Sequence, residues 1–335
     1  EPGLGGAATS GAAIHYDRRM LRMIVCFFVA ACTSVCLAQQ PKAKEMPQEM
    51  VWVSRQGDVL GRVGAVQNSI FFPELSPDEK RIAVSSRNGE MNDRDVWIHN
   101  IASGEKQRIT RVRGNDNFPL WMPDGRSIVF TSSRIPRYDL FRAQLHPLEA
   151  PVRILEAEGT SEYPRDVSPD GKFLIFTKNE PAGRTLWKLD LNSGAVSAFV
   201  PNKVGVWADG GKFSPNGAYF AYSSNEAGMW EVYVCETANP SKKWKVSREL
   251  AGGWAGGGGQ PRWRGDGKEL FYIMGQDTIA SLPVETEGAF THGDAKKLFT
   301  FSSTRGNFQD EAPWLHKYDV TSDGQTFLFV RRVGH

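Results

Sequence analysis

Charged residues recur at one position of a pattern that the chain repeats six times. This position lies two residues before each copy of a turn motif, and its occupants are Glu74, Leu120, Asp166, Lys212, Arg262 and Asp319. In an extended strand, these side chains face away from the apolar residues that directly follow them. Three carboxylates and two cations in one ring could bind a ligand or a peptide. Alternatively, the strands face water in a central channel and carry polar side chains for that reason alone.

The remaining residues of the sequence do not match common catalytic or metal-binding motifs. The six histidines form no HExxH or His-x-His pair that would indicate zinc, and they are His15, His99, His146, His292, His316 and His335. The glycine-rich stretch 251–261 lacks the flanking elements of a phosphate loop, and residues 92–95 lack the ligand spacing of a calcium loop. We therefore expect no enzyme, no catalytic residue, no metal and no cofactor. A site assembled from distant segments would leave no such motif.

The turn motif defines the repeat that must position the charged residues. Its copies include SPDEKRIAVSS from Ser76, SPDGKFLIFTK from Ser168 and SPNGAYFAYSS from Ser214. The anchor residues are Asp78, Asp124, Asp170, Asn216, Asp266 and Asp323, separated by 46, 46, 46, 50 and 57 residues. Such a period is typical of propellers and solenoids. The tripeptide Arg264-Gly265-Asp266 occupies the place of Ser-Pro-Asp, so we interpret it as a turn and not as an adhesion ligand.

Each copy predicts four strands. One ends at the apolar residue before the turn, a β-branched and aromatic run follows the turn, and two further strand-like segments follow that run. The sixth copy ends after its second strand. The segment 50–64 supplies a third and fourth strand without an anchor before them. The sequence therefore predicts an all-β, six-bladed β-propeller over residues 50–332, closed by a two-plus-two clasp of N-terminal and C-terminal strands.

The residues before the propeller resemble an export signal. Arginines precede the apolar run 23–38, which is short for a membrane span. We predict an upstream extension over 1–19, a signal peptide over 20–38 and a linker over 39–49. Cleavage after Ala38 and lipidation at Cys32 both fit, and an uncleaved anchor is a third alternative. Membrane contact is expected only through this signal or the lipid at Cys32.

The amino-acid composition bears on which partners and which chemistry can be expected. The 335 residues contain 40 Lys and Arg against 38 Asp and Glu, which gives no electrostatic reason to expect nucleic acid. Cleavage after Ala38 would leave Cys235 as the one thiol, and its strand-like context predicts a buried, inert side chain. Aromatic residues near the entry of the first strands form a second candidate surface, as blade packing or as contact residues: Phe72, Phe118, Tyr163 and Trp207.

The repeats resemble the TolB-like, WD-type six-bladed propellers of bacteria. Stretches such as ELSPDEKRIAVS and FSPNGAYFAYSSNEAGMWEVYV are most similar to the extracytoplasmic propeller of acidobacterial-type Ser/Thr protein kinases, although no kinase motif is present. The resemblance implies an exported binding module of the envelope or periplasm, which recognises a protein, a peptide or a small ligand at the channel mouth. The alternatives are a propeller lyase or hydrolase acting on oligosaccharides, and a stand-alone sensor domain derived from such a kinase.

Overall fold

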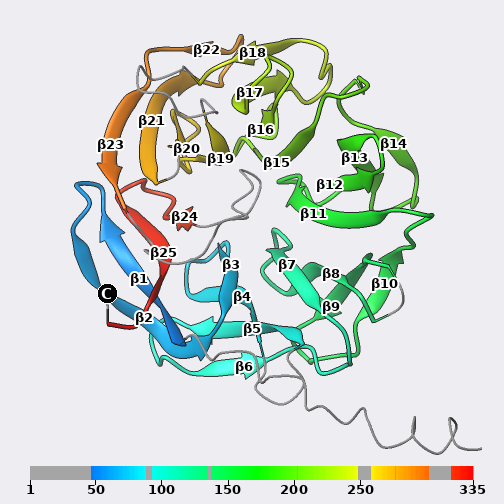
Figure 1. The fold of residues 1–335 in the computed structure, drawn as a ribbon, viewed down its shortest axis with the longest axis vertical. Helices are drawn as coiled ribbons and strands as arrows, with labels where there is room; N and C mark the ends of the chain where they lie inside the picture. Colours follow the sequence, from blue (N-terminus) through cyan, green and yellow to red (C-terminus); the bar gives the residue numbers. More distant parts are fainter. Residues whose placement is uncertain are drawn as a thin grey trace, which may run out of the picture. The chain divides into compact units, whose positions relative to one another are not determined.

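The chain is described by a computed structural model over residues 47–87, 93–134, 137–201, 203–247, 258–275, 277–301 and 318–334. Every regular element in these residues is a β-strand, and they form six antiparallel sheets (Figure 1). The predicted signal peptide, the lipidation candidate Cys32 and residues 251–257 of the glycine-rich stretch lie outside the described residues. Among the described residues, no helix is long and apolar enough to cross a membrane.

Five blades follow one another along the chain. Blade 1 contains β3 (Ile70–Leu75), β4 (Arg81–Arg87), β5 (Arg94–Asn100) and β6 (Lys106–Arg108). Blade 2 contains β7 (Asp116–Trp121), β8 (Ser127–Ser132), β9 (Asp139–Gln144) and β10 (Val152–Leu155). Blade 3 contains β11 (Ser161–Val167), β12 (Phe173–Glu180), β13 (Gly183–Asp190) and β14 (Val196–Ala198). Blade 4 contains β15 (Ala208–Phe213), β16 (Tyr219–Ser224), β17 (Glu231–Glu236) and β18 (Lys243–Lys245).

Blade 5 and blade 6 depart from this simple order. Blade 5 contains β19 (Gly259–Trp263), β20 (Glu269–Met274) and β21 (Thr278–Glu285), and both β22 (Thr291–His292) and β23 (Lys296–Thr300) pair with β21. Blade 6 joins β24 (Tyr318–Val320) and β25 (Thr326–Arg332) to β1 (Pro47–Ser54) and β2 (Val59–Asn68), in the order β2-β1-β25-β24. The six-bladed fold is confirmed, and β1 begins inside the segment predicted as linker.

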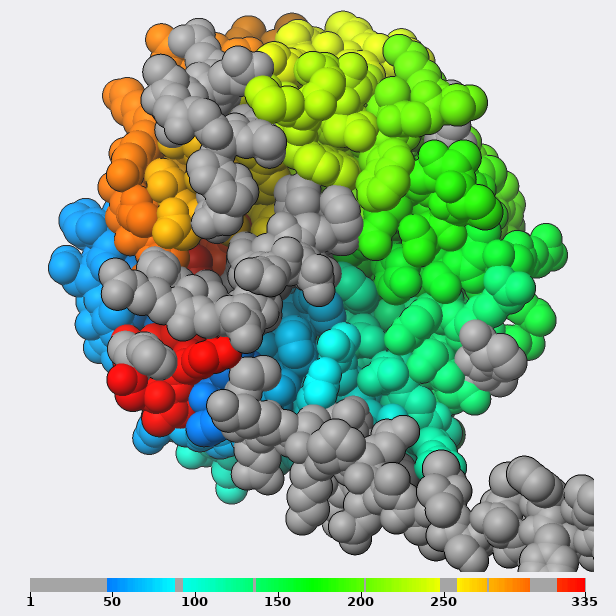
Figure 2. Space-filling model, in the orientation of Figure 1, coloured from blue at the N-terminus to red at the C-terminus, as the bar shows by residue number. Residues whose placement is uncertain are grey.

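The clasp of blade 6 is a regular antiparallel pairing. β1 and β25 pair from Gln48 opposite Arg332 to Ser54 opposite Thr326. Figure 2 shows the blue N-terminal strands and the red C-terminal strand side by side in the ring. The two-plus-two closure predicted from the incomplete first and last repeats is therefore present.

A hydrophobic cluster lies at each of the six blade junctions. At the junction of blades 2 and 3, Val129 packs in one cluster with Phe176. At the junction of blades 3 and 4, Ile175 packs with Phe220 and with the buried Cys235. Burial raises the pKa of the Cys235 thiol to about 12, which agrees with the predicted inert cysteine. The ring is thus held by apolar contacts between neighbouring blades.

The anchor residues close tight turns between the first and second strand of each blade. Each anchor accepts a hydrogen bond from the backbone N–H two residues later, from 2.8 Å at Asp124 to 3.1 Å at Asp78. At Arg264-Gly265-Asp266, the guanidinium donates two 2.7 Å hydrogen bonds to the Asp266 carboxylate. A Cβ on Gly265 would lie 2.8 Å from that of Ser322 in the next blade. The tripeptide is a packed turn, as predicted.

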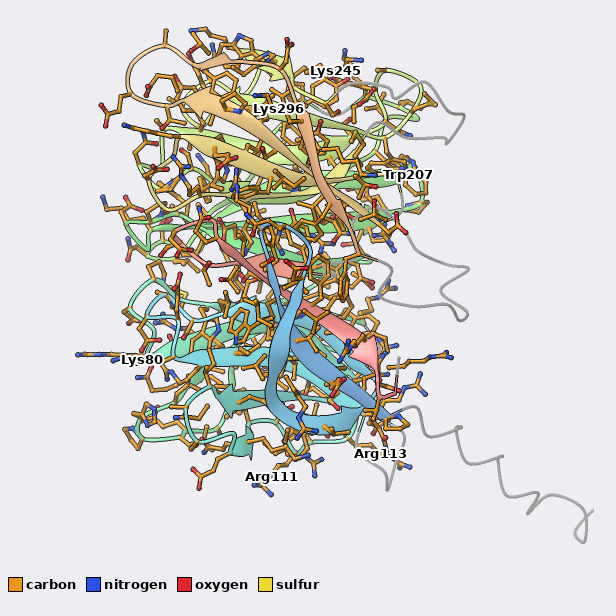
Figure 3. The ribbon with its side chains drawn as sticks, turned by 90° about the vertical axis from the view of Figure 1, so that its left-hand side faces the viewer. Lys80, Arg111, Arg113, Trp207, Lys245 and Lys296 are labelled. Carbon is orange, nitrogen blue, oxygen red and sulfur yellow. The ribbon has the colours of Figure 1, made fainter. Side chains whose placement is uncertain are left out.

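The two faces of the ring carry different segments. The anchor turns, with Lys80 among them, lie on one face, and Trp207 lies on the opposite face (Figure 3). We call these the turn face and the mouth face. The innermost strands β3, β7, β11, β15 and β19 each run from the mouth face towards an anchor turn, so one residue of each strand lies at an equivalent depth in the channel.

Candidate functional site

The five charged residues of the sequence pattern meet at the centre of the ring. The Lys212 ammonium forms ion pairs with Glu74 and, at 3.3 Å, with Asp166. The Arg262 guanidinium lies 3.1 Å from the Asp319 carboxylate and 3.9 Å from Glu74. These five side chains, which we call the central charge network, come from five different blades. Blade 2 contributes the apolar Leu120 at the same position.

The network also ties neighbouring inner strands together. Asp319 accepts a 2.7 Å hydrogen bond from the backbone N–H of Leu75, and Asp166 accepts one of 2.7 Å from that of Phe213. The Lys212 and Arg262 side chains are only 11% and 3% exposed. The side chains expected to face channel water therefore pair with one another inside the protein, as buried charges require.

Burial and ion pairing together set the pKa values of this network. Burial raises the pKa of Glu74 to about 7, although the Lys212 charge acts against this shift. Burial also raises the pKa of Asp166 above its usual value. For Lys212, burial disfavours the ammonium, but the charges of Asp166 and Glu74 outweigh it and raise its pKa. The network thus favours two cations with fewer than three full negative charges near neutral pH.

The raised pKa of Glu74 predicts a pH-dependent contribution to stability. A carboxyl group whose pKa rises from 4.5 to about 7 on folding stabilises the fold fully below pH 4.5. That contribution is lost as the pH rises through 7. The free energy of unfolding of the natural chain, minus that of Glu74→Gln, should therefore fall by about 3 kcal/mol between pH 4.5 and 8. Urea unfolding of both proteins across this range measures the difference, and a difference independent of pH would contradict the assignment.

An aromatic cluster lies beside the network towards the mouth face. The Phe72 and Phe118 rings stack with centroids 3.9 Å apart, and Tyr163 meets Phe118 edge-on at 5.3 Å. Tyr138 continues the series at 5.8 Å from Tyr163. Phe72 and Phe118 are buried, whereas Tyr138 and Tyr163 are half-exposed. Of the four rim aromatics predicted from sequence, three therefore meet in one aromatic cluster, and Trp207 is half-exposed and packs on Gly183.

The backbone of these aromatic residues is unusual. Phe72 and Phe118 adopt φ values of 54° and 52°, a region that bulky side chains rarely enter. In both strands the register shifts at this point, which marks a β-bulge. Blade 4 has Gly210 at the equivalent position, with a φ of 54°. The bulge is therefore a repeated feature, and blades 1 and 2 keep an aromatic ring there despite the backbone cost of roughly 1–3 kcal/mol.

Arg165 and Arg184 add positive charge to this aromatic surface. The fully buried Arg165 lies 2.7 Å from the Asp209 carboxylate, and its guanidinium is 4.8 Å from the centre of the Phe118 ring. Arg184 approaches the other oxygen of Asp209 at 2.8 Å, so two guanidinium groups share one carboxylate. No described residue accepts a hydrogen bond from Nη1 or Nη2 of Arg165. We call Tyr138, Tyr163, Phe118, Arg165 and Arg184 the mouth cluster.

Sequence reasoning missed Arg165, although the repeat contained a signal. In three other blades the same position, directly after the bulge, is occupied by proline: Pro73, Pro119 and Pro261. An arginine in place of a strand proline breaks the pattern of the repeat. The partner of Arg165 could not be found in this way, because Asp209 lies 44 residues further along the chain in the next blade.

The histidines do not form a common site among the described residues. His99 is buried in blade 1 and lies 3.0 Å from Gln67, and burial lowers its pKa to about 4. His146 and His292 are exposed in other blades. His316 and His335 lie outside the described residues. Within residues 47–334, excluding the segments not described, no group of three His, Cys, Asp or Glu side chains could hold a metal ion.

Comparison with known proteins agrees with this architecture. The chain is 31% identical over 155 residues to the Tol-Pal system protein TolB of Francisella tularensis, which covers 45% of the chain and 34% of that relative. The chain thus spans about a third of that protein's length. A solved structure from Agrobacterium tumefaciens, assigned as TolB, superposes with a TM-score of 0.63 at 15% identity and covers 87% of this chain and 99% of the other.

An enzyme shares the fold. Oligogalacturonate lyase from Vibrio parahaemolyticus superposes with a TM-score of 0.52 at 13% identity, covering 84% of this chain and 76% of the lyase. Such low identity shows the fold alone. The family model of the TolB beta propeller domain (PD40) matches residues 51–246, more than half of the 335 residues. The chain therefore belongs to the TolB beta propeller domain family.

Proposed function

We propose that this chain is a non-enzymatic, exported binding module of the bacterial envelope, which recognises a protein or peptide through its mouth face. The observation that carries the proposal is the mouth cluster, where half-exposed tyrosines adjoin two arginines that share a single carboxylate. Tyr, Trp and Arg are the residue types that dominate the energy of protein interfaces. A protein partner in the envelope also agrees with the name of the Francisella relative, a Tol-Pal system protein.

The charge and rigidity of the mouth cluster indicate the chemistry of the partner. Arg165 is fully buried, and Arg184, which shares Asp209 with it, is the partly exposed guanidinium of the cluster, so the surface favours an acidic group of the partner. The bulged inner strands and the central charge network beneath hold these side chains on a rigid scaffold. We assign Glu74, Asp166, Lys212, Arg262 and Asp319 this supporting role, since their charged groups already pair with one another.

A pull-down from envelope extract tests this function, with residues 39–335 as bait. The mouth variant carries Tyr163→Ala and Trp207→Ala, two half-exposed aromatic residues of the mouth face. The control variant carries Lys80→Ala and Arg126→Ala, two exposed residues in anchor turns of the turn face. Both variants are first compared with the natural chain by near-UV circular dichroism and thermal unfolding.

We expect the natural chain and the control variant to retain the same envelope protein, and the mouth variant to retain at least ten-fold less. Loss of one interface aromatic typically costs more than about 1 kcal/mol of binding free energy, so two such losses should be clear in a pull-down. Equal retention by all three baits would place the binding surface elsewhere. Retention of no protein by the natural chain would contradict a binding module and favour a propeller enzyme, which oligosaccharide cleavage assays would then address.

A further inference from the structure

A groove on the turn face separates blades 3 and 4. Its volume is about 430 Å³, which is within the roughly 300–1,000 Å³ range of small-ligand sites. Its lining includes Phe173, Lys188, Phe213, Tyr219, Glu236 and Thr237. The groove lies beside the anchor turn of Asn216, whereas the mouth cluster lies on the opposite face. It is therefore a different surface from the one assigned above to the envelope partner.

The groove is open because its blades lack a bridge that other junctions have. Between blades 1 and 2, Arg81 donates a 2.8 Å hydrogen bond to the Gly125 carbonyl and covers the Trp121 ring at 4.6 Å. Between blades 4 and 5, Tyr219 donates to the Gly288 carbonyl at 2.5 Å. Arg81 and Tyr219 each lie three residues after an anchor.

Phe173 occupies the equivalent position of blade 3, and its side chain has no donor for a hydrogen bond to blade 4. Phe213 stands in blade 4 where blades 2 and 5 have Trp121 and Trp263, and its ring is smaller than an indole. The apolar walls of the groove thus follow from two substitutions within the repeat. The half-buried ring of Phe173 is left facing the groove without a polar cover from the neighbouring turn.

The polar groups of the groove are unpaired hydrogen-bond donors. The Lys188 ammonium lies 4.9 Å from the centre of the Phe173 ring, and no described carboxylate forms an ion pair with it. The hydroxyl oxygen of Thr237 is buried without a hydrogen-bond partner among the described residues. Glu236, the one carboxylate of the lining, is already paired with Lys242. The groove therefore has apolar walls and two donors, the Lys188 ammonium and the Thr237 hydroxyl, without a hydrogen-bond partner among the described residues. These features favour an anionic acceptor joined to an apolar group.

We propose that this groove binds the C-terminus of a peptide chain whose last residue is apolar. The terminal carboxylate would be held by the Lys188 ammonium and the Thr237 hydroxyl, and the last side chain would lie against Phe173, Phe213 and Tyr219. A chain terminus provides both parts at adjacent atoms. This proposal does not depend on the mouth face, because the two sites share no residue and can be tested separately.

Titration calorimetry at constant ionic strength tests the proposal with two matched peptides, acetyl-Ala-Ala-Phe with a free carboxylate and the same peptide as its amide. We expect the acid to bind at least ten-fold more tightly than the amide. Lys188→Gln should weaken the binding of the acid peptide by about ten-fold and leave the binding of the amide peptide unchanged. The control is Lys172→Gln, a neighbouring lysine that pairs with Asp170 and does not line the groove, and it should bind both peptides as the natural chain does.

Equal binding of acid and amide, or no binding of either, would overturn the proposal. Equal losses of affinity for the acid peptide in Lys188→Gln and Lys172→Gln would also overturn it, since the loss would then come from the overall charge of the protein. If Lys188→Gln does not fold, Thr237→Val provides the same comparison, because it removes the second donor and keeps the volume. Binding of 3-phenylpropanoate as tightly as the peptide acid would reassign the groove to small carboxylates and overturn the peptide terminus as its occupant.

Discussion

Replacement of Lys212 by methionine should destabilise the propeller by about 3–5 kcal/mol, because it removes the cation that two buried carboxyl groups share. Lys212 is 11% exposed and contacts both Glu74 and Asp166, so solvent can compensate for only a small part of the lost charge. Methionine has nearly the same length as lysine, and the loss should therefore reflect charge more than volume. Urea unfolding measured at pH 8, where Glu74 is mostly ionised, should show the full effect.

Two comparisons distinguish this effect from a general loss of a lysine. Lys172→Met removes an exposed lysine from its pair with Asp170 and should leave the unfolding midpoint unchanged. Adding Glu74→Gln to Lys212→Met should recover part of the lost stability, since one uncompensated carboxylate is removed with its partner. If the double variant were less stable than Lys212→Met alone, the ion pairs of the central charge network would not be the source of the stability.

Removal of the N-terminal clasp should prevent cooperative folding. A chain that begins at residue 69 lacks β1 and β2, and with them four core side chains that are at most 4% exposed: Met50, Val51, Val53 and Val63. Burying four such side chains is worth about 6–12 kcal/mol, which is comparable with the whole stability of an ordinary domain. The loss would also leave β25 as an unpaired edge, a known cause of aggregation.

Near-UV circular dichroism and urea unfolding test the clasp. The control chain begins at residue 45, where the compact propeller unit starts, and should unfold in one cooperative transition. The chain that begins at residue 69 should show no such transition. A cooperative transition with the same dependence on urea would mean that five blades and a half-blade are sufficient, and would contradict a ring closed by β1 and β25.

The fold could be predicted from the sequence because each blade repeats its local chemistry. Every anchor combines a turn residue with an apolar residue before it and a strand-forming run after it, so six copies indicated six blades. The clasp could be predicted equally well, because the strands missing from the last repeat matched the extra strands that precede the first repeat. Bulges were not predicted, since Phe72 and Phe118 adopt φ values that their residue type disfavours and only the tertiary contacts enforce them.

The site could be predicted only in part. Strand alternation and the repeat were enough to bring Glu74, Lys212 and Arg262 to the same depth in the channel. Their burial depends on how closely the six inner strands approach one another, and no local sequence pattern determines that distance. Arg165 was missed because its significance lies in Asp209 and Phe118, which come from two neighbouring blades. Contacts between blades thus decide which charged residues support the fold and which remain available for a partner.

Site-specific photo-crosslinking in envelope extract tests the role of the mouth face most directly. A benzoylphenylalanine at position 138 replaces a half-exposed tyrosine of the mouth cluster, and one at position 80 replaces an exposed lysine of the turn face. We predict one dominant protein adduct from position 138 and none of that protein from position 80. Adducts of the same protein at position 80 but not at position 138, or no protein adduct at position 138, would contradict a binding module that acts through its mouth face.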